Sequence, residues 1–171
     1  MKVYVDRVGS PAGDLAFAVD GEGTLVALHF VEGDGDYGLE EALEDEGFVV
    51  SQDKGRTART RGELREYYAG ERREFGLPIL LVGSEWQKAV WRELTRIPYG
   101  ETRSYGEIAD RLDRPGAARA VGRANATNRL PLVVPCHRVI AADGTLGGFN
   151  GGLHLKERLL EHERRVMAAG S

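Results

Sequence analysis

Residues 133–140, with the sequence VVPCHRVI, form the stretch around which the rest of the chain is organised. Cys136 is the only cysteine among the 171 residues, and His137 and Arg138 follow it directly. Pro135 fixes its own φ angle and biases the residue before it toward extended backbone. An imidazole and a cation beside a thiol both favour the thiolate form. The stretch therefore predicts a shaped loop that carries a nucleophilic cysteine.

Cys136 also has a plainer interpretation, because a free cysteine is more often an inert buried side chain than a nucleophile. Residues 132–134 are expected to run extended into the cysteine, and neighbours on an extended chain point to opposite sides. His137 therefore needs a turn or a bridging water to exchange a proton with the thiol, and a third group to orient it. Spacing does not choose among the candidates on the last helix, which are the carboxylates Glu157, Glu161 and Glu163 and the competing bases His154 and His162.

Two capping boxes start helices upstream of the cysteine. Ser84 and Gln87 stand three residues apart, so that the serine oxygen can accept from the N3 amide and the glutamine can reach back to the cap. The apolar stripe that follows ends before Pro98. Ser104 and Glu107 repeat the pattern and start a second, shorter helix.

A further helix follows this short one after a tight turn. Residues 113–115, Asp-Arg-Pro, predict the turn, and a proline there suits the start of a helix over about residues 116–126. Arg119 and Arg123 lie four residues apart and share its outer face. Two short helices joined in this way are typical of a helix-turn-helix that binds DNA, although many helical hairpins only form core.

The first half of the chain carries strand signals, and its expected elements follow one another in order. These are a strand over residues 2–7, a β-hairpin over 13–19 and 24–30, a short helix over 39–46, a strand over 48–50, a helix over 57–69 and an edge strand or linker over 77–82, where Pro78 lies. A final helix is expected from residue 153 to about 165. We therefore expect domains over residues 1–80 and 81–166, and a frayed tail over 167–171.

Charge divides the chain in the same place. Residues 1–80 hold 9 Lys and Arg against 17 Asp and Glu, whereas residues 81–171 hold 14 against 10. A basic second half within a chain of net charge −4 favours contact with phosphates there. No stretch reaches the roughly 18 apolar residues of a membrane helix, and the start of the chain lacks the apolar core of a signal peptide. We therefore expect an intracellular protein without a membrane partner. One cysteine and four scattered histidines give no zinc spacing.

Several motifs together are similar to those of a known family. They are residues 97–100 (IPYG), Ser104-Tyr105, 118–122 (ARAVG), Asn128, 134–139 (VPCHRV), 151–153 (GGL) and Lys156-Glu157. Between about Trp86 and Glu163 the chain resembles the O6-alkylguanine-DNA alkyltransferases. The resemblance implies an α+β fold. It consists of an N-terminal small β-sheet domain with helices, ribonuclease H-like, and a C-terminal, mostly helical domain that contains the helix-turn-helix.

The resemblance also implies an activity and a set of catalytic roles. The family repairs DNA by moving the alkyl group of O6-alkylguanine irreversibly onto its own cysteine, so each molecule acts once and needs no cofactor. Carried over to this chain, Cys136 accepts the alkyl group and His137 is the base, acting through a water. Glu163 orients His137, and Asn128 supports the active-site loop. Activity on O4-alkylthymine stays open, as does the alternative of a non-catalytic protein that only binds alkyl lesions.

The DNA contacts implied by the resemblance lie on both sides of the cysteine. Tyr105 rotates the nucleotide out of the stack, and Arg119 fills the space it leaves. The set expected to touch DNA or the flipped base is Tyr105, Arg119, Arg123, Val139, Phe149 and Asn150. Phe149 stands where many members have tyrosine. Small Ala and Gly residues suit the minor groove, and the implied partner is double-stranded DNA bound there by a monomer in the cytoplasm.

Overall fold

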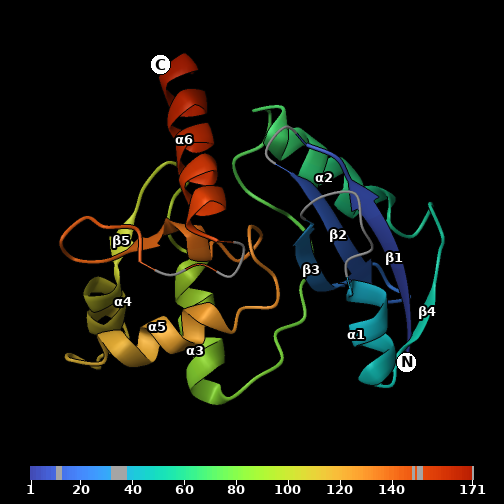
Figure 1. Cartoon of the computed structure of the whole chain (residues 1–171), viewed down its shortest axis with the longest axis horizontal. Helices are drawn as coiled ribbons and strands as arrows, with labels where there is room; N and C mark the ends of the chain where they lie inside the picture. The colour runs from blue at the N-terminus through green and yellow to red at the C-terminus, as the bar shows by residue number, and fades with distance from the viewer. Residues whose placement is uncertain (11–12, 32–37, 148, 150–151, 171) are drawn as a thin grey trace. The chain divides into compact units, whose positions relative to one another are not determined.

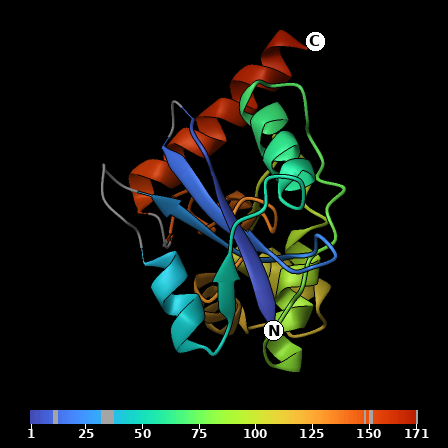
Figure 2. The same ribbon diagram turned by 90° about the vertical axis from the view of Figure 1, so that its right-hand side faces the viewer.

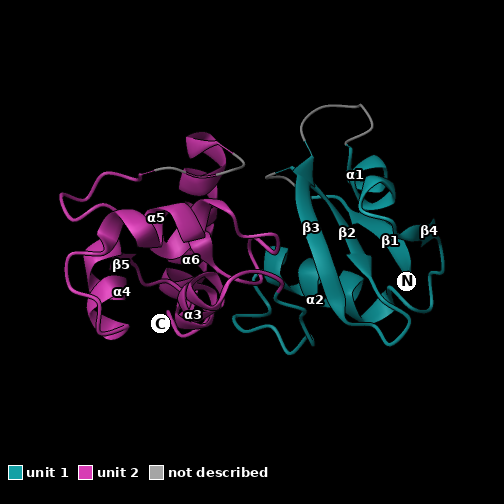
Figure 3. Cartoon of the chain, turned by 90° about the horizontal axis from the view of Figure 1, so that it is seen from below, with its two compact units in different colours: residues 1–81 teal, residues 82–171 magenta. Residues whose placement is uncertain are grey.

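The structure is a computed structural model that describes residues 1–10, 13–31, 38–147, 149 and 152–170. The chain divides into two compact units, Met1–Leu81 and Val82–Ser171, which are coloured separately in Figure 3. The α+β fold class is confirmed. No helix within the described ranges has the length and apolar character needed to span a bilayer.

The first unit is a mixed four-stranded sheet with two helices (Figure 1). Its strand order is β3-β2-β1-β4; β1 pairs antiparallel with β2 and parallel with β4, and Figure 2 shows β4 beside β1. The elements are β1 Lys2–Val8, β2 Asp14–Val19, β3 Leu25–Val31, α1 Leu39–Asp45, β4 Val49–Ser51 and α2 Ala58–Tyr68. The predicted hairpin is confirmed, and Asp20 closes its loop by accepting from the N–H groups of Glu22 and Thr24 at 2.9 and 3.0 Å.

The two helices pack against opposite faces of this sheet. Alternate residues of a strand face opposite sides, and in β1 Val3 and Val5 pack with Leu39 and Leu43 of α1. Asp6 faces the other way and meets α2. Residues 77–82 form no full strand; the carbonyl of Pro78 and the N–H of Leu80 bond the backbone of Leu25 on β3, as suits an edge segment that contains a proline.

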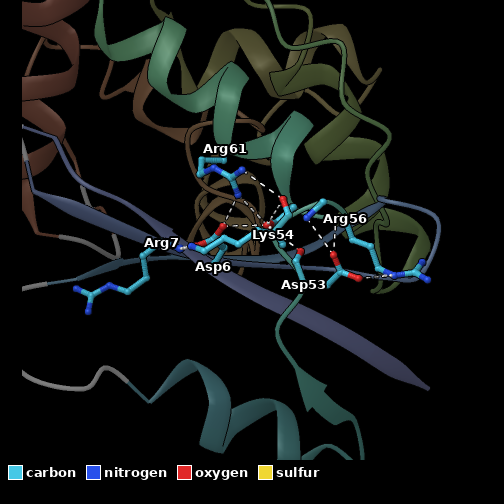
Figure 4. A network of polar contacts seen from close by, with 8 residues as sticks. Asp6, Arg7, Asp53, Lys54, Arg56 and Arg61 are labelled. Atoms are coloured by element: carbon cyan, nitrogen blue, oxygen red, sulfur yellow. Dashed lines mark hydrogen bonds and ion pairs between the residues drawn. The ribbon is translucent and has the colours of Figure 1, made fainter.

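Asp6 carries a buried carboxylate at the centre of an ion-pair network (Figure 4). Its Oδ1 accepts from Lys54 Nζ at 2.6 Å, and its Oδ2 accepts from Thr57 Oγ1 at 2.8 Å and Arg61 Nη1 at 2.5 Å. The Arg7 side chain points away, but its backbone N–H also donates to Oδ1. Burial opposes ionisation, yet these donors outweigh it and lower the pKa of Asp6 from 3.8 to about 2.

Replacing Asp6 with asparagine is expected to lower the free energy of unfolding by about 2 kcal/mol at pH 7. The depressed pKa means that the carboxylate stabilises the fold fully above pH 3.8, and that this contribution is lost as the pH falls toward about 2. The difference between variant and wild type should therefore shrink over that window in urea unfolding followed by circular dichroism. Asp14→Asn, which breaks a half-exposed pair with Arg7, is the control and should cost less than about 1 kcal/mol. A difference that does not change with pH would contradict the prediction.

The second unit is mostly helical, and Figure 1 shows α4 and α5 as its consecutive short helices. Its elements are α3 Glu85–Leu94, β5 Arg103–Ser104, α4 Tyr105–Arg111, α5 Ala118–Ala126, the 3₁₀ turn η1 Cys136–Arg138, β6 Val139–Ile140 and α6 Leu153–Ala169. Both predicted capping boxes are present at α3 and α4. Two tryptophans of α3 bond α5: Trp86 Nε1 donates to the carbonyl of Ala120 at 3.2 Å and Trp91 Nε1 to that of Ala124 at 2.8 Å.

Three local predictions were wrong in this unit. Helix α5 begins at Ala118 and not near 116, because Gly116 has a φ of +85°, which no α-helix accommodates. Residues 132–134 turn tightly and do not run extended, with Leu132 at a φ of +76°. The tail, which was expected to be frayed, is helical as far as Ala169. Within it, the side chain of Met167 lies against Gly100.

Candidate active site

The side chain of Asn128 forms hydrogen bonds with both sides of the turn that leads into Cys136. Its Nδ2 donates to the carbonyl of Val134 and its Oδ1 accepts from the N–H of Leu130, both at 2.9 Å. The Asn128 side chain and the Leu132 N–H also hydrogen-bond the sulfur of Cys136. A left-handed conformation costs a residue such as leucine about 1–3 kcal/mol. The bonds of Asn128 and the burial of Leu132 hold this strained turn, which aims a backbone donor at the thiol.

The 3₁₀ turn η1 gives His137 and Arg138 a common partner. His137 Nε2 lies 2.6 Å from Oε2 of Glu163, and Arg138 Nε donates to Oε1 at 2.9 Å. The N–H of Gly100 also donates to Oε1, at 3.0 Å. Arg138 further donates to the carbonyl of Ile97 at 2.8 Å. Of the three carboxylates that the sequence left open, Glu163 is buried beside His137, whereas Glu157 and Glu161 are exposed, as is His154.

Burial and the contact with Glu163 act in opposite directions on the protonation of His137. Burial works against ionisation of Glu163, but the hydrogen bonds from His137 and Arg138 hold its pKa well below the usual range. Burial lowers the pKa of His137, and this effect exceeds the raising effect of Glu163. A neutral imidazole beside a carboxylate donates to it through Nε2, which leaves Nδ1 as the acceptor. In the part of the chain that the structure describes, Nδ1 has no hydrogen-bond partner.

His137 and Arg138 are neighbours in sequence that favour a thiolate at Cys136, but burial of the sulfur opposes it. Cys136 is only 4% exposed, and burial raises the pKa of its thiol to about 11 in spite of the Asn128 hydrogen bond and the nearby charge of Lys156. Arg138, which was expected to favour the thiolate, turns instead to Glu163 and Ile97. The thiol is therefore neutral at physiological pH and needs a base at the moment of reaction.

Lys156 is a fully buried cation in the same site. Its Nζ donates to the carbonyls of Val139, at 2.5 Å, and Leu146, and it lies 6.0 Å from the ring centre of Tyr105. Burial lowers its pKa to about 8. Lys156 thus links β6, the loop after it and α4, and contributes positive charge near the sulfur.

A pocket of about 460 Å³ opens beside the cysteine loop. Tyr105, Ala118, Arg119, Gly122, Asn125, Ala126, Gly147 and Phe149 line it. Gly147 has a φ of +67°, and a Cβ there would lie 2.6 Å from the hydroxyl of Tyr105, so only glycine lets the tyrosine ring pack against this loop. The pocket has an aromatic wall, a cation at its edge and small residues elsewhere, which suits a flat aromatic ligand.

The structure brings most of the predicted site residues together. Tyr105, Arg119 and Phe149 line one pocket. The carbonyl of Val139 accepts a hydrogen bond from Lys156 Nζ at 2.5 Å. Arg123 is exposed on α5 outside the pocket, and Asn150 lies outside the described residues. In the described ranges no group of three His, Cys, Asp or Glu could hold a metal ion.

Asn125 is a pocket residue that sequence reasoning missed. It lies near the end of α5, buried, and its Nδ2 donates to the carbonyl of Cys136 at 3.4 Å. The only signal in the sequence was a polar residue on the inward face of a helix whose neighbours there, Val121 and Ala124, are small and apolar.

Comparison with known proteins agrees with this geometry. A family model described as "6-O-methylguanine DNA methyltransferase, DNA binding domain" matches residues 85–165. A methylated-DNA–protein-cysteine methyltransferase of Mycobacterium leprae is 53% identical over 162 residues, which cover 95% of this chain and 93% of that protein. The crystal structure of O6-methylguanine methyltransferase from Mycobacterium tuberculosis has a TM-score of 0.81 at 39% identity, with 99% of each chain covered.

A crystal structure of Mycobacterium tuberculosis OGT in complex with DNA is also similar. It has a TM-score of 0.80 at 38% identity, and the match covers 97% of this chain and 94% of that one. Similarity at this level along nearly the whole length, together with the buried Cys136, His137 and Glu163, leads to one assignment. The chain belongs to the methylated-DNA–protein-cysteine methyltransferase family and is an O6-methylguanine DNA methyltransferase, an enzyme of direct-reversal DNA repair.

Proposed function

We propose that Cys136 accepts the alkyl group of O6-alkylguanine in one irreversible step, so that each molecule acts once. His137 takes the thiol proton at Nδ1 through a water. The sulfur then attacks the alkyl carbon, a C–S bond forms, and the C–O6 bond breaks. Its electron pair stays on the guanine, which regains a proton. Glu163 orients His137 and stabilises the imidazolium.

One observation carries this proposal most strongly. His137 Nε2 is held 2.6 Å from a carboxylate, and in the described ranges Nδ1 is buried without a partner. This is the tautomer that a base requires. A base is needed because burial raises the pKa of Cys136 to about 11. Asn128 supports the loop in this proposal, since it bonds Val134, Leu130 and the sulfur.

The DNA partner is proposed to be a duplex that contains O6-alkylguanine, bound through its minor groove by the basic unit. A base inside a duplex hides its O6 substituent, so the nucleotide must be flipped into a pocket. Tyr105 and Phe149 would flank the flipped base, Arg119 would fill the vacated space, and Arg123 would contact a phosphate. One chain supplies every residue of the site, which supports action as a monomer, and the substrate requires that it act inside the cell with the DNA.

The mass of the peptide that contains Cys136 tests the acceptor role. Incubation with duplex DNA carrying O6-methylguanine is expected to add one methyl group to this peptide and to no other. The control is the same duplex with unmodified guanine, which should leave the peptide unchanged. Tight binding of the damaged duplex with an unmodified Cys136 would contradict the proposal and favour a protein that only binds the lesion.

A further inference from the structure

Arg138 is a buried cation of the active site to which the proposed mechanism gives no role. Its guanidinium makes a two-point contact with Glu163, in which Nε donates to Oε1 at 2.9 Å and Nη2 donates to Oε2 at 3.1 Å. The exposed fractions of the two side chains are only 7% and 1%. A two-point contact fixes the plane of a carboxylate as well as balancing its charge. Arg138 therefore determines how Glu163 faces its other partner, His137.

The turn that follows α3 holds this ion pair in place. The carbonyl of Ile97 accepts from Arg138 Nη1 at 2.8 Å, and the N–H of Gly100 donates to Oε1 of Glu163 at 3.0 Å. Gly100 has a φ of +79°, and a Cβ at this position would lie 2.7 Å from the side chain of Met167. The amide can therefore approach the carboxylate only because the residue is glycine.

Glu163 consequently has a donor at each of the roughly four lone-pair positions of a carboxylate. Arg138 and Gly100 supply three of these donors, and Nε2 of His137 supplies the other at 2.6 Å. Only one position of the carboxylate is thus left for the imidazole, which fills it through Nε2. This arrangement keeps Nδ1 of His137 as the nitrogen that can accept the proton of Cys136.

Arg138 also supplies the positive charge that a buried carboxylate requires. A guanidinium keeps its proton in a protein, so this charge is permanent. If Arg138 were absent, the titratable group in closest contact with Glu163 would be His137, which could balance the carboxylate by taking up a proton. A protonated imidazole donates through both nitrogens and cannot accept the proton of a thiol.

We infer that Arg138 is a positioning residue for alkyl transfer: it holds Glu163 fixed and charge-balanced, so that His137 stays neutral and available as the base. The charged groups that act on His137 are Glu163 and Lys156 of α6 and Arg138 of its own turn, and the neighbouring Cys136 thiol is neutral. Glu163 favours the imidazolium, whereas the two cations oppose it. The inference rests on the proposed function, because it requires His137 as the base.

The test compares Arg138→Gln with wild type between pH 6.5 and 8. Single-turnover transfer from free O6-benzylguanine to Cys136 is measured, and each rate is divided by the folded fraction from circular dichroism. The variant should react at least about tenfold more slowly at pH 6.5, and its rate should rise by up to about tenfold per pH unit, because its His137 must first lose a proton. The wild-type rate should change little.

The ¹⁵N signals of the His137 ring supply the decisive measurement, since a rate that rises with pH would also follow from loss of the base. At pH 6.5 these signals should show an imidazolium in Arg138→Gln and the neutral Nε2–H tautomer in wild type. His137→Gln identifies the signals by their absence. A merely structural role of Arg138 would not change the protonation of the ring.

Two matched variants separate charge from geometry. Arg138→Lys keeps the charge but cannot make the two-point contact, so His137 should stay neutral while the rate falls about three- to tenfold at every pH. Arg96→Gln removes an arginine that lies 2.8 Å from Glu93, another buried carboxylate of this unit. This control should keep the wild-type rate and pH profile.

Three results overturn the inference: a neutral His137 ring at pH 6.5 in Arg138→Gln, a protonated ring in Arg138→Lys, or a wild-type rate in Arg138→Lys. The lysine variant decides the question if Arg138→Gln does not fold. Failure of the proposed function is distinguishable, because wild type would then leave Cys136 without a benzyl group.

Discussion

Replacing His137 with glutamine is expected to slow alkyl transfer to Cys136 by about 10²–10⁴-fold, the usual contribution of a positioned base. The glutamine amide can still donate to Glu163, but it cannot accept a proton. The pKa of Cys136 is raised to about 11 by burial, so the variant must react through the small fraction of thiolate present at neutral pH. The measurement is the single-turnover rate with O6-benzylguanine.

The pH dependence separates loss of the base from a general defect. Between about pH 6.5 and 8 the rate of His137→Gln should rise close to tenfold per pH unit, because the thiolate fraction does so below a pKa of about 11. Burial lowers the pKa of His137, so the transfer rate of the wild type should change little over this pH range. Lys156, with a pKa of about 8, keeps much of its charge in this window.

Two further variants make the result specific. His154→Gln removes an exposed histidine of α6, the helix that carries Glu163, and this variant should react as wild type. Glu163→Gln should react slowly, as His137→Gln does, and it should also unfold more easily by about 3–5 kcal/mol, because it leaves Arg138 buried without its counter-ion. A flat pH profile and normal rate in His137→Gln would show that another group takes the proton.

Local signals in the sequence were enough to place much of the second unit. A capping box depends on two residues three positions apart, so Ser84 with Gln87 and Ser104 with Glu107 could be identified without tertiary information. The Cys-His-Arg motif could also be identified without tertiary information, because its three residues are consecutive in the sequence. The carboxylate that orients His137 lies 26 residues further on. From the residues alone it could not be chosen from three, and only the family resemblance indicated Glu163.

Features that depend on burial or on long-range contacts were not predictable in this way. Arg138 was expected to promote a thiolate because it is adjacent in sequence, yet its guanidinium bonds Glu163. The pKa of Cys136 depends on how completely the fold removes water from it. The left-handed Leu132 is stable because Asn128 holds both sides of the turn, which no propensity of leucine indicates. The buried side chain of Asn125 donates to the carbonyl of Cys136, a contact between residues 11 positions apart that no local pattern indicates.

Replacing Arg119 with alanine is expected to slow repair of O6-methylguanine in a duplex by about 10–100-fold, while reaction with free O6-benzylguanine changes by less than about threefold. Arg119 is exposed on α5 at the edge of the pocket, and in the described residues it makes no hydrogen bond or ion pair. Flipping a nucleotide costs a few kcal/mol of unstacking. A side chain that fills the vacated space offsets part of that cost, and a free base requires no flipping.

Arg123 supplies the matched control, since it lies one turn further along α5, is exposed and does not line the pocket. Arg123→Ala should remove one phosphate contact. It should weaken binding to any duplex equally and reduce the slope of log affinity against log salt by about one, with little change in the transfer rate at saturating DNA. Arg119→Ala should differ in kind: its defect should persist at saturating DNA and shrink when the lesion is mispaired, because a mispaired base costs less to unstack. Equal slowing of the duplex and free-base reactions would rule out a role in flipping and leave Arg119 a part of the pocket wall.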